Sequence, residues 1–292
     1  MPIEILTHST SLDGNLPQFK FSNPITHFVY GISGFNVGYR SDTDHHLETF
    51  KISFIVNQPT SDTVELSPAV EFHDNSGHHD VGSSSISVTV IAWFDEDNLV
   101  KFTNTPAIAS GNNYRIASKQ HAFSLASFVA GFDLSYGDHV DHHVETMGLA
   151  TTSSQEPGVL MVGAEASMYD ASGNQSLNPT VSAGVIASYL PDAGFEMQVV
   201  QGTITPQKPL TVQFHRDIDQ AALLLVDFNL SYGNEDHHIE NVIAGYLPTP
   251  GFPQINGSTA SFYLTGCDMN DNSGNKATRR KYHMLAIGRY AQ

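Results

Sequence analysis

The stretch Gly131-Phe132-Asp133-Leu134-Ser135-Tyr136, followed closely by Asp141-His142-His143-Val144-Glu145, has two counterparts elsewhere in the chain. The first is Gly34-Phe35-Asn36-Val37-Gly38-Tyr39 with Asp44-His45-His46-Leu47-Glu48, and the other is Asp227-Phe228-Asn229-Leu230-Ser231-Tyr232 with Asp236-His237-His238-Ile239-Glu240. Similarity at a nearly constant spacing, here that of Phe35, Phe132 and Phe228, indicates tandem copies of one structural unit.

A second motif follows about 30 residues later in each copy, in keeping with a repeated supersecondary unit. It reads Asp74-Asn75-Ser76-Gly77, Asp170-Ala171-Ser172-Gly173 and Asp271-Asn272-Ser273-Gly274, and each copy then ends in an apolar run (87–94, 182–189 and 283–290). The sequence therefore predicts three domains, 1–98, 99–195 and 196–292. Only short turns separate these copies, so we expect the domains to pack on one another.

Short apolar runs between turn residues predict strands rather than helices, and the 23 Gly and 14 Pro fit this pattern. In the third copy we expect strands over 197–200, 210–214, 221–230, 238–246, 261–266 and 283–290. The predicted fold is all-β, with three tandem six-stranded antiparallel β-sandwich domains. If the strands run up and down, the loops that carry the two motifs lie at the same end. The motif Asp-x-Ser-Gly is typical of a turn whose glycine is left-handed.

Charge and composition limit the classes of partner and the location that we expect for this protein. Lys and Arg number 13 against 30 Asp and Glu, a formal net charge of −17, so the surface repels nucleic acid and anionic membranes. The single cysteine, Cys267, excludes an internal disulfide. We expect no signal peptide and no membrane insertion. The expected location is therefore cytoplasmic, non-classically exported or particle-associated.

The strand pattern resembles the H-type lectin domain. The third copy carries the resemblance in 210–214, in Leu223-Leu224-Leu225-Val226-Asp227-Phe228-Asn229-Leu230 and in Leu285-Ala286-Ile287-Gly288-Arg289-Tyr290. The second copy carries it in Phe128-Val129-Ala130-Gly131-Phe132-Asp133-Leu134. The resemblance implies six-stranded β-sandwiches that bind sugars, typically N-acetylgalactosamine, and assemble as trimers. Three fused copies would then form a pseudo-threefold, single-chain trimer, with a further homo-oligomer also open.

The chain departs from that family where the family binds sugar. Family members carry an Arg on the return strand and a Trp-containing loop before the last strand. Here the His-His pairs stand in place of the first and Asp-x-Ser-Gly in place of the second, while the single Trp, Trp93, falls in a final strand. The family's sugar specificity therefore does not transfer to this chain.

The Asp-His-His-x-Glu segments are the main candidate site. Side chains alternate along an extended strand, so Leu47, Val144 and Ile239 should face the core. The opposite face then carries a carboxylate, an imidazole and a carboxylate in each copy. These candidate ligand-binding residues are Asp44, His46, Glu48, Asp141, His143, Glu145, Asp236, His238 and Glu240.

Three interpretations of these rows remain open. They could bind a divalent metal such as zinc or calcium, with candidate ligands His45, His46, His142, His143, His237 and His238. They could contact a sugar through carboxylates that accept hydrogen bonds. They could instead line the contact between domains, with Asp and Glu orienting each His. In the first copy, His73, His78 and His79 also make the Asp-x-Ser-Gly loop a candidate metal site.

The sequence contains no Gly-x-Ser-x-Gly motif, no phosphate-binding glycine loop and no Cys-His nucleophile arrangement, so no catalytic residue is assigned. Three equal copies favour multivalent binding over a single active site. We therefore expect a non-catalytic, multivalent carbohydrate-binding or adhesion protein whose partners are glycans. The alternatives are a structural component of a virion, tail fibre or larger particle and, third, a metal-dependent hydrolase.

Overall fold

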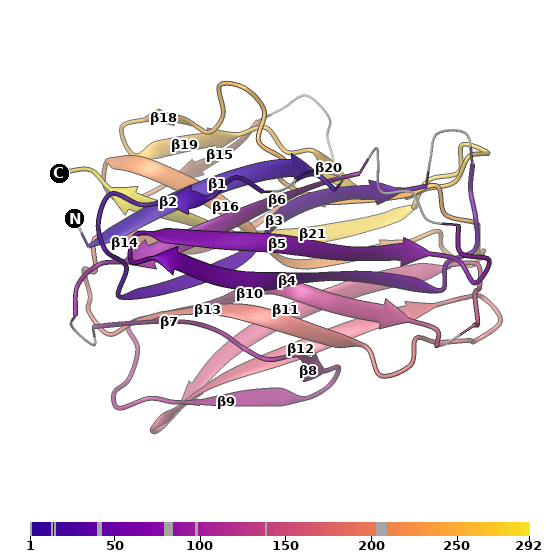
Figure 1. The fold of residues 1–292 in the computed structure, drawn as a ribbon, viewed down its shortest axis with the longest axis horizontal. Coiled ribbons are helices and arrows are strands. Elements are labelled where there is room, and N and C mark those ends of the chain that lie inside the picture. Colours follow the sequence, from indigo (N-terminus) through magenta and orange to yellow (C-terminus); the bar gives the residue numbers. More distant parts are fainter. Residues whose placement is uncertain are drawn as a thin grey trace.

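A computed structural model describes residues 2–12, 14, 16–39, 43–78, 84–96, 99–137, 139–202 and 209–292. Within these residues the secondary structure is strand without helix, which confirms the predicted all-β class. The described part therefore has no helix able to cross a membrane. Most strands run along the long axis, and both termini lie at one end of the molecule (Figure 1).

The strands follow the sequence repeat. Residues 1–98 contain β1 (Ile3–Ser11), β2 (Phe19–Lys20), β3 (His27–Gly38), β4 (Thr49–Thr60), β5 (Thr63–His73) and β6 (Ser85–Trp93). Residues 99–195 contain β7 (Val100–Asn104), β8 (Ile108–Ala109), β9 (Asn113–Ala117), β10 (Ser124–Ser135), β11 (Thr146–Glu156), β12 (Val159–Tyr169) and β13 (Thr180–Ser188). The remaining strands are β14 (Phe195–Gln201), β15 (Leu210–Gln213), β16 (Ile218–Ser231), β17 (Asn241–Gly245), β18 (Gln254–Asn256), β19 (Thr259–Phe262), β20 (Gly266–Asn270) and β21 (Arg279–Tyr290). The predicted boundary residue 98 lies outside the described residues.

Each copy pairs its strands in the same order. In the first copy β1, β6 and β3 are neighbours in one sheet, and β2, β5 and β4 in another. The second copy repeats this order with β7-β13-β10 and β9-β12-β11, and the third begins it with β14-β21-β16. The pairs are antiparallel.

The third copy departs from the strands expected for it. The strand predicted over 261–266 is wrong: β19 ends at Phe262 and β20 begins at Gly266. The strand predicted from residue 238 begins only at Asn241. Gly245 and Gly266 face each other and both have a positive φ, which interrupts the hairpin at this point. The outer parts, β18 and β19, instead form a small sheet with β15.

The sheets continue from one copy into the next. Strand β4 pairs with β10, β11 pairs with β16, and β17 pairs with β3. These three pairings close a cycle, so an edge strand of every copy is covered by its neighbour (Figure 1). The sequence predicted that the copies pack together, but the structure shows that they share sheets.

Aromatic side chains from all three copies meet in the core. The phenylalanines of the repeated motif, Phe35, Phe132 and Phe228, are buried with ring centroids 5.8–6.4 Å apart. A second core also draws on every copy and contains Trp93, Phe102 and Phe195. Burial of these rings makes the copies mutually dependent for their stability.

Candidate functional site

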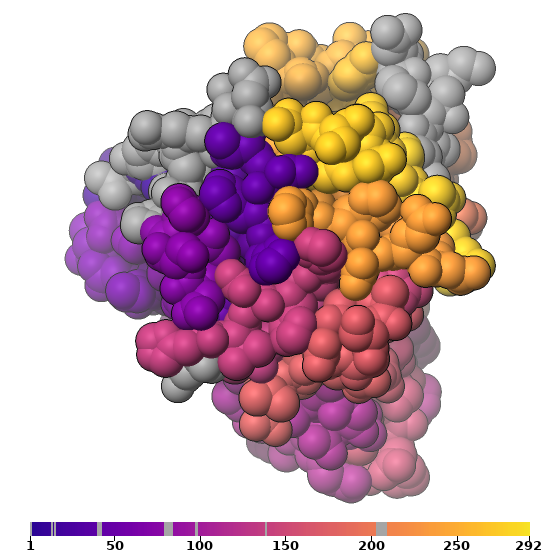
Figure 2. Space-filling model, turned by 90° about the vertical axis from the view of Figure 1, so that its right-hand side faces the viewer, coloured from indigo at the N-terminus to yellow at the C-terminus, as the bar shows by residue number. Residues whose placement is uncertain are grey.

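The Asp-His-His-x-Glu segments of the three copies meet at one end of the molecule. Single antiparallel bridges join His45 to Ile239, Leu47 to His142, and Val144 to His237. Leu47, Val144 and Ile239 are fully buried, as their alternation predicted. Each segment is held by such bridges rather than by a continuous strand. In Figure 2 the indigo, pink and orange parts of the three copies converge at the centre of this end.

Each histidine at the second His position faces an aspartate of another copy. The Nδ1 atom lies 3.3 Å from a carboxylate oxygen in the pair His46–Asp141, and 3.4 Å in the pairs His143–Asp236 and His238–Asp44. An ionised carboxylate only accepts hydrogen bonds, so Nδ1 carries the hydrogen. The rows therefore lie in the contact between the copies.

The same aspartates are held by the Asp-x-Ser-Gly turns. The backbone N–H of Asn75 donates to Asp141 at 3.1 Å, that of Ala171 to Asp236 at 3.2 Å, and that of Asn272 to Asp44 at 3.3 Å. The two motifs thus lie at the same end, as an up-and-down order of strands predicted. In each aspartate one carboxylate oxygen accepts from the turn N–H and the other faces the imidazole.

The Asp-x-Ser-Gly segments are turns, as predicted. The glycines Gly77, Gly173 and Gly274 have φ values of 77°, 92° and 90°, in the left-handed region. The buried Asp of each turn lies 3.1–3.2 Å from the first His of its own copy, in the pairs His45–Asp74, His142–Asp170 and His237–Asp271. The first and second histidines therefore have different partners.

The first copy differs from the other two at one position of this turn. His78 lies 2.7 Å from Asp74, whereas Asn174 and Asn275 each donate to the corresponding aspartate at 2.6 Å. The ring of His78 stacks on that of His45 with centroids 4.3 Å apart. Of the three histidines predicted for an extra site in this loop, His78 lies in a group with His45 and Asp74. His73 contacts Glu48 instead, and His79 lies outside the described residues.

Burial and hydrogen bonding perturb the carboxyl groups of these turns. Burial raises the pKa of Asp74, but hydrogen bonds from the side chain and backbone of His78 outweigh it, and the net pKa is lowered. The pKa values of Asp170 and Asp271 are lowered in the same way, against burial, by hydrogen bonds from Asn174 and Asn275. These turns consequently hold their aspartates ionised.

The three second histidines form a triangle. Their ring centroids lie 4.6 Å apart for His46–His143 and His143–His238, and 4.8 Å apart for His46–His238. Burial, followed by the neighbouring His238 and His46, lowers the pKa of His143 and favours its neutral form. Of the six predicted metal ligands, these three come together, whereas His45, His142 and His237 face the turns.

The glutamates of the rows bond to different parts of the molecule. Glu48 accepts a hydrogen bond from the backbone N–H of His139 at 3.1 Å, and Glu240 accepts one from the Asn270 amide at 2.9 Å. The backbone carbonyl of Glu145 accepts a bond from Tyr232 N–H. Glu48 and Glu145 thus bond to the next copy, whereas the Glu240 side chain bonds to β20 of its own copy.

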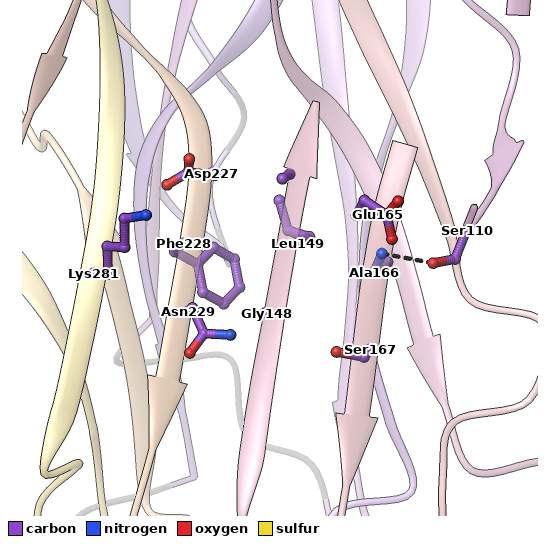
Figure 3. A pocket seen from close by; sticks show the side chains of 11 residues that line it. Ser110, Gly148, Leu149, Glu165, Ala166, Ser167, Asp227, Phe228, Asn229 and Lys281 are labelled. Carbon is purple, nitrogen blue, oxygen red and sulfur yellow. Dashed lines mark hydrogen bonds between the residues drawn. The ribbon is translucent and has the colours of Figure 1, made fainter. Parts of the chain in front are cut away.

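A polar groove, which sequence analysis missed, lies where β11 of the second copy pairs with β16 of the third. It has a volume of about 380 Å³. Asp227, Asn229 and Lys281 lie on one side of Gly148, and Glu165 and Ser167 on the other (Figure 3). The register sets small residues against polar ones: Gly148 pairs with Asn229 and Ser167, and Ala150 pairs with Asp227 and Glu165. The hollow therefore follows from the small side chains on β11.

Two contacts orient the walls of this groove. His283 Nδ1 lies 2.7 Å from an Asp227 oxygen, and Ala166 N–H donates to Ser110 Oγ at 2.9 Å (Figure 3). The Ser110 hydroxyl is the acceptor in this bond. Carboxylate, amide, ammonium and hydroxyl groups thus surround one hollow. No sequence signal marked it, because its residues come from two copies.

The pocket at the equivalent junction, between the first and second copies, is smaller than this groove. This pocket has a volume of about 210 Å³, and Lys51 stands where Gly148 stands in the larger groove. The Lys51 ammonium lies 2.9 Å from Glu71 and 3.8 Å from Asp133. At the third junction Ile243 takes this position opposite Asn36. The three junctions therefore share a backbone arrangement but differ in side chains.

Comparisons of the sequence with protein-family models and with curated proteins found no match.

Proposed function

We propose that this chain is a lectin-like, carbohydrate-binding protein without catalytic activity, and that it binds sugar at the junctions between its copies. In this proposal three six-stranded β-sandwich domains form a pseudo-threefold, single-chain trimer. The observation that carries the proposal is the polar groove between β11 and β16. Its volume of about 380 Å³ falls within the usual range of small-ligand sites.

The groups in the groove suit sugar hydroxyls. Carboxylates such as Glu165 and Asp227 accept hydrogen bonds from hydroxyls, whereas the Asn229 amide can both donate and accept. Lys281 supplies a further donor. Because Gly148 and Ala150 are small and do not fill the groove, a pyranose ring can approach the sheet while its hydroxyls reach the polar side chains on both sides.

The junctions also allow more than one sugar to bind. The pocket between β4 and β10 occupies the equivalent place and carries Lys51 and Asp133. Several weak sites on one rigid body raise the avidity for a glycan-coated surface without any new contact. The valency is measured by the number of sugars bound per chain at saturation.

The test is a broad glycan array followed by calorimetric titration of the sugar that binds. Glu165→Gln and Asn229→Ala should each weaken binding about 10- to 100-fold, the effect of losing a hydrogen bond to a charged group or leaving a partner unpaired. The control is Glu156→Gln, which removes the same charge from an exposed position on β11. Equal affinity of all three variants for the sugar would place the sugar elsewhere. The absence of binding to any glycan on the array would contradict the proposal.

A second candidate function is a structural component of a virion, tail fibre or larger particle. The observation that favours it is the use of the repeated Asp and His side chains for contacts between copies. A protein that binds no glycan on the array and forms ordered higher assemblies at increasing concentration would support this candidate. A monomer at all concentrations would weigh against it.

A further inference from the structure

The triangle of histidines at the end of the molecule lies outside the junction grooves. We propose that His46, His143 and His238 together bind one divalent transition-metal ion of the zinc class, and that this ion joins the three copies. Each ring offers a ligand nitrogen, and the three nitrogens lie within 4.8 Å of one another. The ligands are 95 and 97 residues apart in sequence (238 − 143 and 143 − 46), so the ion would cross-link distant parts of the chain.

The spacing is close to that of a loaded site. Zinc binds imidazole nitrogen at about 2.0–2.1 Å, so tetrahedral ligand nitrogens lie about 3.3–3.5 Å apart. The rings need to move inward by roughly 1 Å or less per ring, a small adjustment about their side-chain torsions. Each histidine is about 40% exposed, which leaves a fourth coordination position open to water.

The surrounding carboxylates prepare the rings for metal binding. Nδ1 of each ring carries a hydrogen toward Asp141, Asp236 or Asp44, so Nε2 keeps its lone pair. Metal-binding histidines commonly donate their other ring N–H to a carboxylate in this way, which fixes the tautomer and raises the basicity of the ligand. Here every carboxylate is itself fixed by a backbone N–H of a turn.

The identity of the ligands favours transition metals over calcium. Neutral imidazole suits zinc, copper, iron and nickel, whereas calcium takes oxygen ligands. The aspartates lie on the Nδ1 side of the rings and balance the charge of the ion without coordinating it. Calcium should therefore bind to this site much more weakly than zinc.

A second group of candidate ligands provides an internal comparison. His45, Asp74 and His78 also lie within 4.8 Å of one another, but only the first copy has this set. Asn174 and Asn275 occupy the position of His78 in the other copies and make the same bond to the turn aspartate. His78→Asn thus gives the first copy the residue of its counterparts and leaves the histidine triangle intact.

The experiment uses the full chain, purified without a histidine tag and treated with a chelator. Calorimetric titration with Zn²⁺ should give one ion per chain, and Co²⁺ should give the visible absorption of a four-coordinate site. His143→Asn should reduce the affinity for zinc by more than about 100-fold, and Asp236→Asn by about 10- to 100-fold. His78→Asn should leave both affinity and cobalt spectrum unchanged.

Three results would overturn the proposal. They are the lack of stoichiometric Zn²⁺ or Co²⁺ binding by the wild-type chain, unchanged binding by His143→Asn, and loss of binding in His78→Asn. The wild-type titration decides the question even if a variant fails to fold. Because sugar binding is measured on the array with apo protein, failure of the metal site and failure of the junction groove are separate outcomes.

Discussion

Replacement of Phe132 by alanine would remove a ring that all three copies share. Phe132 is 4% exposed, and its ring centroid lies 6.0 Å from Phe35, 6.4 Å from Phe228 and 4.9 Å from Phe50. These partners come from the first and third copies. The substitution therefore leaves a cavity where the copies meet rather than within one of them.

The expected loss of stability is large. Phe-to-Ala substitutions in well-packed cores cost about 3–5 kcal/mol, because the transfer free energy of the ring is lost and the surroundings collapse only in part. Small domains have total stabilities of about 5–15 kcal/mol, so the loss is a substantial fraction. The closed cycle of sheet pairings limits collapse at this position and favours the upper part of the range.

The assay is equilibrium unfolding in denaturant, followed by far-UV circular dichroism and by Trp93 fluorescence. Trp93 is buried against Phe102 of β7 and Phe195 of β14, so it reports on the contact of the first copy with the rest of the chain. Shared sheets predict that both signals change in one coincident transition. Phe123→Ala is the matched control because Phe123 is 68% exposed, and it should cost no more than about 0.5 kcal/mol.

Two outcomes would refute this reasoning. A loss of unfolding free energy in Phe132→Ala that equals the loss in Phe123→Ala would show that the contacts among Phe35, Phe132 and Phe228 do not contribute to stability. Separate transitions for the two signals in the wild-type chain would show that the copies unfold independently.

Two further predictions concern the turns and the junctions. The turn aspartates have folded pKa values below their ordinary values, so their contribution is complete above about pH 5 and is lost as the pH falls below about 4. The urea midpoint of unfolding should therefore decrease as the pH is lowered from 6 to 3. Asp170→Asn should have a lower midpoint than the wild type at pH 6 and a smaller decrease toward pH 3. Midpoints of the two proteins that decrease in parallel with pH would contradict this assignment. Gly131→Ala places a Cβ 2.8 Å from the carbonyl oxygen of Ile52 across the β4–β10 junction, and it should cost about 1–3 kcal/mol in denaturant unfolding. An unchanged midpoint in Gly131→Ala would show that the junction can widen freely.

The sequence alone determined the class of fold and the threefold repetition. Alternation of apolar residues and clusters of turn residues depend on neighbours along the chain, so they are visible without a structure. For the same reason the burial of Leu47, Val144 and Ile239, and the left-handed glycines of the Asp-x-Ser-Gly turns, were predictable. The broken hairpin of the third copy was not predicted, because the interruption arises where Gly245 and Gly266 pair across two strands.

Only the tertiary structure decided which side chains act together. The sequence placed Asp44 beside His46, but the aspartate that bonds to His46 is Asp141 of the next copy. The groove at Gly148 likewise combines residues of β11 and β12 with residues of β16 and β21. Both sites depend on pairing between strands of different copies. In a hairpin the turn sets the register, whereas the strands of these pairs belong to different copies and no turn joins them.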